Sequence, residues 1–284
     1  MGKPCIGVNL YGLGVRGGAQ FEEAAPKLAE YGFSAVEPLV ILSCDREKAL
    51  GNPLFPAAIW QQEELVKRSR LLKEQYDMHI VSCHVGGIPG DDFSKKAESL
   101  IEILQTTDVR FFVFSRMLHS ADACERDADM FARCAEAVAP YGGTICYHNH
   151  EPEMQRGLFA GKEQTFLDIL LSLCPALMLE ADLGWIRYAG EDEVAFLHTH
   201  KDRLRLLHLK DFKNGFSPER REKDNVALGE GVLRLSEILA VAREIGLDDR
   251  LIIDQDCSSG DLLQDLKRGA ALCLSSAGSV PEGL

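Results

Sequence analysis

The segment 176–211, ALMLEADLGWIRYAGEDEVAFLHTHKDRLRLLHLKD, contains two short apolar runs separated by a helix-like stretch. The runs cover residues 176–182 and 204–210, and the stretch EVAFLHTHK between them has apolar residues at helical spacing. Two buried strands joined in this way run parallel, because a parallel connection needs a crossover of a dozen or more residues. The segment therefore predicts a strand–helix–strand unit.

The same unit recurs along the chain. Between the apolar runs, apolar residues recur at i, i+3, i+4 and i+7, which is typical of helices lying on a sheet. Eight such units predict an α/β fold, namely a single (β/α)8 TIM barrel domain over residues 1–284. A doubly wound open sheet is the competing fold, but the segment GLGVRGG at 12–18 lacks the GxGxxG spacing of that class. The expected strands are residues 5–10, 35–39, 80–84, 111–115, 144–149, 176–182, 204–210 and 251–256.

Composition narrows the class of protein and its partners. The chain has 284 residues, of which 46% are hydrophobic, and a formal net charge of −13. An acidic surface repels a phosphate backbone, so we expect no nucleic acid partner. No apolar run approaches the roughly 18 residues of a membrane span, so we expect no membrane partner. Nine cysteines without a CxxC pair predict free thiols and a reducing, cytoplasmic location.

Polar residues gather where the expected strands end, at Asp182, His208 and Asp254 among others. Side chains alternate along a strand, so each of these shares a face with the residue two positions away. If those faces point inward, the three side chains meet at the mouth of the barrel, where barrel active sites lie. Two carboxylates and an imidazole suit Mn²⁺, Mg²⁺, Co²⁺ or Zn²⁺. The structural alternative is that each Asp caps a loop and the His packs in the core.

Five motifs carry a family resemblance. They are YHNHEPE (147–153), LEADLGWIRYAGED (179–192), RLLHLKD (205–211), LGEG (228–231) and LIIDQD (251–256). In order and spacing they resemble the sugar phosphate isomerase/epimerase family of xylose isomerase-like barrels, which also holds inosose dehydratases. The resemblance implies one divalent metal ion, held by Glu, Asp, His and Glu after strands five to eight. Asp182 and His208 match the Asp and the His of that set.

Two positions depart from the family pattern. Asp254 stands where a Glu is usual, and its side chain is one methylene shorter. Cys146 falls where many members carry the strand-five Glu. We therefore expect Glu153, just beyond the strand, to be the fourth metal ligand, with Glu151, His148 and His150 as the alternatives.

The resemblance also implies a reaction. A metal ion of this kind polarises a carbonyl and stabilises an enediolate, which makes the chain an isomerase or epimerase of a sugar, keto-sugar or sugar phosphate. His148 and His150 are the expected acid/base residues, and Lys210 is expected to neutralise the developing oxyanion. The expected substrate-binding residues are Glu37, His84, Asn149, Trp185, Glu230 and Gln255. For each of these six residues the alternative is a purely structural role.

Other functions stay open at this point. A dehydratase or β-eliminating lyase of an inosose or 3-keto-sugar shares the same metal site, and a histidine-rich fifth strand favours it. A non-enzyme alternative is a metal-free sugar-binding or partner subunit. In each case the partner is a small carbohydrate, and the resemblance also allows a homo-oligomer.

Overall fold

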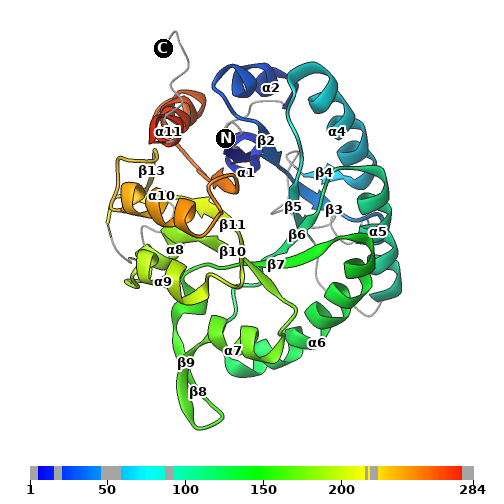
Figure 1. Cartoon of the computed structure of the whole chain (residues 1–284), viewed down its shortest axis with the longest axis vertical. Coiled ribbons are helices and arrows are strands. Elements are labelled where there is room, and N and C mark those ends of the chain that lie inside the picture. Colours follow the sequence, from blue (N-terminus) through cyan, green and yellow to red (C-terminus); the bar gives the residue numbers. More distant parts are fainter. Residues whose placement is uncertain are drawn as a thin grey trace.

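The computed structural model describes residues 6–15, 21–45, 59–86, 93–214, 217 and 223–276. Within them a ten-stranded sheet curls into a barrel, and every pairing in this sheet is parallel (Figure 1). All eight expected strands are present. The barrel strands are β1 (Ile6–Asn9), β2 (Ala35–Glu37), β3 (Leu39–Ile41), β5 (Ser82–Gly86), β6 (Phe111–Phe114), β7 (Thr144–His148), β10 (Met178–Asp182), β11 (Leu204–Leu209) and β14 (Leu251–Ile253).

The second expected strand is split in two, and the split closes the ring. β2 pairs with β1 and β3 pairs with β5, while only Pro38 separates the two halves. Proline has no N–H to donate to a ladder, but its carbonyl accepts from the N–H of His84 at 2.9 Å. β4 (Trp60–Gln61) adds a short strand outside β3. The chain itself therefore links β2, at one end of the sheet, to β3, the second strand from the other end.

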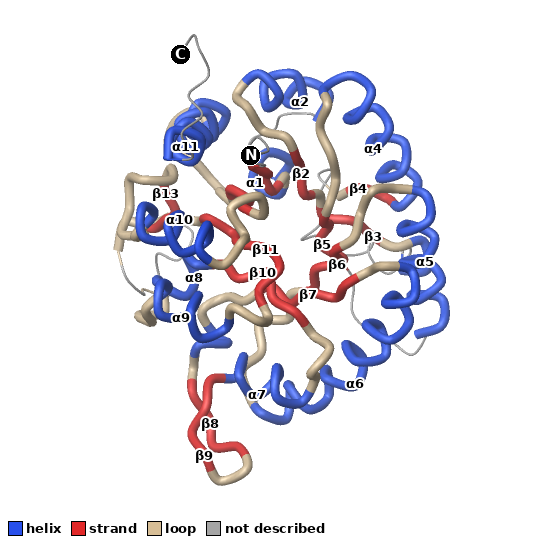
Figure 2. Tube along the Cα trace, in the orientation of Figure 1, coloured by secondary structure: helices blue, strands red, loops and turns tan. Residues whose placement is uncertain are grey.

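Helices surround the strands, as Figure 2 shows. Several begin at capping side chains: the Ser120 hydroxyl accepts from the N–H of Ala123, and the Asp192 carboxylate accepts from Val194 and Ala195. The fold is a TIM barrel, as predicted; that residues 1–284 form one domain stays a prediction. The helices are α1 (Tyr11–Val15), α2 (Phe21–Glu30), α4 (Gln62–Tyr76), α5 (Phe93–Thr106), α6 (Ala121–Val138), α7 (Phe166–Leu173), α8 (Leu183–Tyr188), α9 (Glu193–His200), α10 (Leu235–Glu244) and α11 (Leu262–Ser276). None of the described helices is long and apolar enough to cross a membrane.

Two small antiparallel pairs lie outside the barrel, and the sequence analysis missed both. β8 (Arg156–Phe159) and β9 (Lys162–Thr165) form a hairpin that projects beyond α7 (Figure 1). β12 (Asp211–Phe212) and β13 (Asn225–Val226) pair within the long connection after β11.

An apolar floor fills the barrel interior. Val113, Cys146, Leu206 and Ile252 pack together there, with Phe111 and Met178 against them. These residues come from neighbouring strands, and the residue two positions further along each strand is on the same face. Polar side chains that share this face therefore lie above the floor, toward the carboxyl ends of the strands. Cys146 belongs to the floor, so it does not stand at the level of the site.

Candidate functional site

Four inward-facing side chains from neighbouring strands converge above the floor. We call His148, Asp182, His208 and Asp254 the outer group; one ligand atom of each lies within 4.8 Å of those of the others. His208 Nδ1 is 3.1 Å from Asp254 Oδ2, and His148 Nε2 is 3.7 Å from Asp182 Oδ2. The structure thus brings together Asp182, His208 and Asp254, the three residues that strand alternation predicted to meet at the mouth of the barrel.

Glu153, the expected fourth ligand, is engaged elsewhere. Its carboxylate accepts hydrogen bonds from the Tyr147 hydroxyl at 2.6 Å, the Leu118 N–H at 2.6 Å and the His150 N–H at 3.0 Å. Tyr147 precedes His148 on β7, so its side chain leaves the strand on the face away from the interior. Glu153 therefore holds the loop after β7, and His148 is the fourth member of the outer group, while the identity of the metal ligands stays a prediction.

A second group lies against the first. We call Glu37, His84, Glu180 and His208 the inner group. His84 Nε2 is 2.8 Å from Glu180 Oε1 and 3.3 Å from Glu37 Oε2. His208 Nε2 is 3.1 Å from Glu180 Oε1 and 2.7 Å from Glu37 Oε2. Glu180 shares the inward face of β10 with Asp182, and its place in the motif LEADLGW was the signal that the sequence offered.

Buried charge shifts the pKa of several of these groups. Burial raises the pKa of Asp182 to about 7, although the Lys210 ammonium opposes the shift. At Asp254 burial acts in the same direction, but Lys210 and His208 outweigh it and hold the pKa well below its ordinary value. Burial would lower the pKa of His84, yet the carboxylates of Glu180 and Glu37 raise it to about 10. The charged forms thus depend on one another.

Several carboxylate oxygens of these groups have no hydrogen-bond partner although they are buried. An unpaired buried acceptor costs free energy, so native structures rarely retain one without a bound water or ion. Carboxylate oxygens and ring nitrogens are the donors that divalent transition metals take in proteins. The residues therefore fit a divalent cation. The oxygens are Glu37 Oε1, Glu180 Oε2, Asp182 Oδ2 and Asp254 Oδ1.

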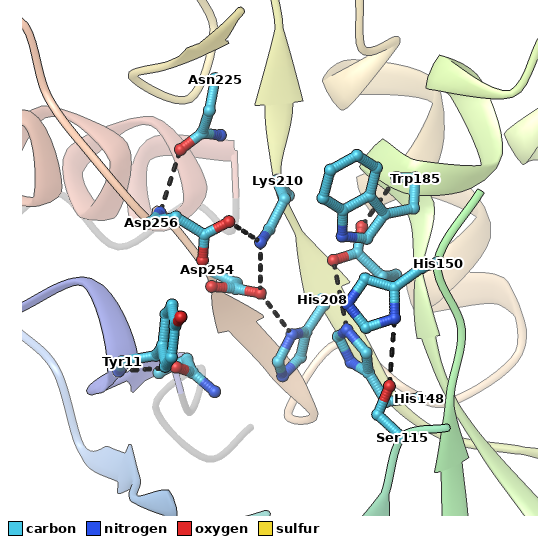
Figure 3. A network of polar contacts seen from close by, with 12 residues as sticks. Tyr11, Ser115, His148, His150, Trp185, His208, Lys210, Asn225, Asp254 and Asp256 are labelled. Atoms are coloured by element: carbon cyan, nitrogen blue, oxygen red, sulfur yellow. Dashed lines mark hydrogen bonds and ion pairs between the residues drawn. The ribbon is translucent and has the colours of Figure 1, made fainter. Parts of the chain in front are cut away.

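A cavity of about 290 Å³ opens directly above the outer group. Figure 3 shows two flanks: on one side Lys210 lies between Asp254 and Asp256, and on the other His150 contacts Ser115. The Lys210 ammonium is 2.9 Å from Asp254 Oδ2 and 2.8 Å from Asp256 Oδ2, so its partners are these two carboxylates and not Asp182 or Glu180. The cavity is lined by Asn9, Tyr11, Leu39, His84, Ser115, Met117, His148, His150, Trp185, Lys210, Asp254 and Asp256.

Of the six expected substrate contacts, His84 and Trp185 line this cavity and four do not. Glu37 belongs to the inner group below it. The Asn149 amide donates to the Asp182 carbonyl at 3.2 Å and accepts from its N–H at 3.0 Å, so it fixes a ligand strand. Gln255 donates to Asp265 at 2.9 Å, while Glu230 pairs with Arg268 at the surface. Gln255 and Glu230 line a separate cavity of about 500 Å³ beside α11.

Ser115 and Asn9 are cavity residues that the sequence analysis missed. Each follows or ends a short apolar run, FVFS and IGVN, in the same way as the polar residues that were selected. The signal was therefore present. It was weaker because Ser and Asn often end strands for reasons of turn geometry alone.

Two glycines let the surrounding loops approach the site. A Cβ at Gly184 would lie 2.2 Å from the Lys210 carbonyl oxygen, so only glycine lets α8 reach the end of β11. A Cβ at Gly231 would lie 2.1 Å from Asp211 Oδ1. Asp211 accepts from the N–H groups of Gly229, Gly231 and Leu233, and so anchors the LGEG motif.

Together these features define a TIM barrel protein with buried imidazoles and carboxylates at the mouth of the barrel. Residues 25–274 match the model of the xylose isomerase-like TIM barrel, and the chain belongs to this family. The resemblance seen in the motifs is thus confirmed at the level of the family. A search of curated proteins gives no match.

Solved structures extend the comparison. The chain is similar to a sugar phosphate isomerase/epimerase from Parabacteroides distasonis ATCC 8503, with a TM-score of 0.72 and 20% identity over 97% of this chain and 95% of that one. It is similar to the IolI protein, whose structure holds a zinc atom, with a TM-score of 0.68 and 12% identity over 97% and 100% of the chains. It is also similar to a probable 3-DHS dehydratase, AsbF from Bacillus anthracis. The TM-score is 0.65, and the identity is 14% over 98% of this chain and 100% of that one. Identities this low show a shared fold.

Proposed function

We propose that the chain is a divalent-metal-dependent isomerase or epimerase that acts on a sugar, keto-sugar or sugar phosphate. The observation that carries the proposal is the outer group, four buried donors below a cavity of about 290 Å³. Ligand pockets for small molecules begin at about 300 Å³, so the cavity suits a small substrate. His148, Asp182, His208 and Asp254 would hold Mn²⁺, Mg²⁺, Co²⁺ or Zn²⁺.

The bound ion would act as a Lewis acid that polarises a substrate carbonyl. It would thereby favour loss of a proton from the neighbouring carbon, which gives an enediolate. His150 is the proposed acid/base residue, because it lines the cavity and its Nδ1 lies 3.0 Å from the Ser115 hydroxyl, which orients the ring. His148, expected earlier in that role, is a ligand in this proposal. Lys210, on the opposite flank, would use its ammonium to neutralise the developing oxyanion.

Trp185 forms one wall of the cavity and is itself held by aromatic packing. Its ring centroid is 4.5 Å from that of Phe212 and 5.5 Å from that of Tyr188. A fixed apolar ring face suits the C–H face of a sugar ring, which supports a carbohydrate substrate. The described cysteines are free thiols, which supports the proposed cytoplasmic location. A homo-oligomer stays a prediction.

The experiment measures metal content and proton exchange together. Purified protein is analysed for divalent ions and then incubated in D₂O with a panel of ketoses, and deuterium at the carbon beside the carbonyl is followed by NMR. We expect exchange that a chelator abolishes and that His150→Asn lowers by roughly 10²–10⁴-fold, the usual contribution of a general base. His198→Asn is the matched control, because it makes the same change at an exposed histidine on α9. Protein that binds no ion would instead support the metal-free binding subunit.

A second candidate is a dehydratase or β-eliminating lyase of an inosose or 3-keto-sugar. The observation that favours it is the pair of imidazoles on β7 and the loop after it, His148 and His150, whose ring centroids are 5.0 Å apart. One imidazole near a metal ion and one in the cavity suit proton removal followed by protonation of a leaving group. Loss of water from keto-sugars without deuterium exchange into unreacted ketose would select this candidate.

A further inference from the structure

The inner group has the donor atoms of a metal site of its own. Three of its members, His84, Glu180 and His208, belong with His148 to a set whose ligand atoms all lie within 4.8 Å of one another. The four donor atoms of the inner group are His84 Nε2, His208 Nε2, Glu37 Oε2 and Glu180 Oε1, and each nitrogen–oxygen separation among them lies between 2.7 and 3.3 Å. Zn²⁺ bonds to nitrogen and carboxylate oxygen at about 2.0–2.2 Å. The edge of a tetrahedron is about 1.6 times its centre-to-corner distance, so these bonds require donors about 3.3–3.5 Å apart. The four nitrogen–oxygen separations are shorter than these distances by up to about 0.8 Å, so the nitrogen and oxygen donors would move apart to admit an ion.

Hydrogen bonding alone does not satisfy this group. Three ring nitrogens surround the single oxygen Glu180 Oε1: those of His84 at 2.8 Å, His148 at 3.0 Å and His208 at 3.1 Å. An oxygen of a carboxylate offers about two lone-pair sites, so it cannot accept from all three. Meanwhile Glu180 Oε2 and Glu37 Oε1 are buried without any hydrogen-bond partner. The side chains of Glu180 and Glu37 are 0% and 1% exposed, so bulk water does not replace the missing partners.

The balance of charge points the same way. Five carboxylates lie in the two groups and at the edge of the cavity. Among the described residues, the lysine that forms ion pairs with them is Lys210, through Asp254 and Asp256. With neutral imidazoles as ligands, the cluster carries a formal charge of about −4, which one divalent ion halves and two divalent ions neutralise. The carboxylates are those of Glu37, Glu180, Asp182, Asp254 and Asp256.

We propose that the inner group binds a second divalent cation, of the nitrogen-preferring Zn²⁺ or Co²⁺ class. Four protein ligands from β2, β5, β10 and β11 make it a closed site of the structural kind. His208 then serves the inner ion through Nε2 and donates from Nδ1 to Asp254, 3.1 Å away. The inner ion thus takes His208 out of the ligand set named under the proposed function, and His148, Asp182 and Asp254 remain as a three-ligand outer site with an open position for a substrate.

The test counts ions site by site. Protein stripped with a chelator is titrated with CoCl₂, bound cobalt is measured after dialysis, and the visible absorption of Co²⁺ reports its coordination. We expect two ions per chain in the wild type, and one in each of His84→Gln and Asp182→Asn. The single ion kept by Asp182→Asn should give the intense absorption of four-coordinate Co²⁺. His198→Gln, which removes an exposed imidazole on α9, is the matched control and should bind two.

The outcomes separate this inference from the proposed function. One ion in the wild type that His84→Gln retains and Asp182→Asn loses overturns the inner site and leaves the outer site standing. One ion that His84→Gln loses and Asp182→Asn retains supports the inner site and removes the metal from the proposed reaction. No bound ion overturns both. If His84→Gln fails to fold by circular dichroism, Asp182→Asn decides: the loss of all bound cobalt in this variant, or weak absorption of the ion that it keeps, overturns the inner site.

Discussion

Replacing Lys210 by methionine removes the cation that stands between two buried carboxylates. The Lys210 side chain is 3% exposed, and its ammonium lies 2.9 Å from Asp254 Oδ2 and 2.8 Å from Asp256 Oδ2. Removing one partner of a buried ion pair typically costs about 3–5 kcal/mol. The Asp256 side chain is 18% exposed and can be hydrated, and His208 still contacts Asp254 at 3.1 Å. We therefore expect Lys210→Met to cost about 3 kcal/mol at neutral pH, or roughly a hundredfold in the unfolding constant.

The sign of the pH dependence follows from Asp254. In the wild type its pKa is held well below the ordinary value, so its stabilisation is present above pH about 4 and is lost only as the pH falls through the lowered pKa. In Lys210→Met, burial without the cation raises this pKa, so acid protonates Asp254 and relieves the penalty. The free energy of unfolding, from urea titrations in the presence of a chelator, should differ most near neutrality and least near pH 4. A loss under about 1 kcal/mol at neutral pH, or one that is constant with pH, would refute this reasoning. Lys201→Met, at an exposed lysine, is the control.

Three further changes test other parts of the structure. His84 has a pKa raised to about 10, so in metal-free protein its stabilisation is full below about pH 6.5 and is lost as the pH rises toward 10; His84→Gln should flatten that fall in urea titrations. Gly184→Ala places a Cβ 2.2 Å from the Lys210 carbonyl oxygen and should cost about 1–3 kcal/mol, seen as a lower Tm. Glu153→Gln loses an anion that accepts three hydrogen bonds and should destabilise by about 1–3 kcal/mol while the number of bound metal ions stays the same; a loss of bound metal would restore Glu153 as a ligand.

Strand alternation predicted the part of the site that lies on regular strands. Asp182 and His208 sit on β10 and β11, and Asp254 follows β14 directly, so period two fixed which way each one points. The position of Glu153 could not be predicted in this way, because the strand ends at His148 and the chain then turns through Pro152–Met154, where alternation carries no information. Side-chain alternation therefore predicts the direction of a residue only within a strand.

Depth along the barrel axis was the second limit. Glu37 and His84 were expected as substrate contacts because they end their runs, yet Glu37 lies in the inner group and only His84 reaches the cavity. Height in a barrel depends on the stagger between neighbouring strands, which is a property of the closed sheet and not of any one strand. The β8–β9 hairpin was missed for a different reason. Its side chains are mostly exposed or half-exposed, so it shows no apolar run.

Lys210 and Asp211 are adjacent in the chain, but their side chains leave the barrel wall in opposite directions. The lysine balances charge inside, and the aspartate ties down the loop that holds Gly229 and Gly231 outside. A shift of β11 by a single residue would exchange them, since side chains change sides at every step. An ammonium would then meet the loop's N–H groups, and a further carboxylate would enter an acidic interior. A single-residue insertion or deletion in this strand should therefore not be tolerated.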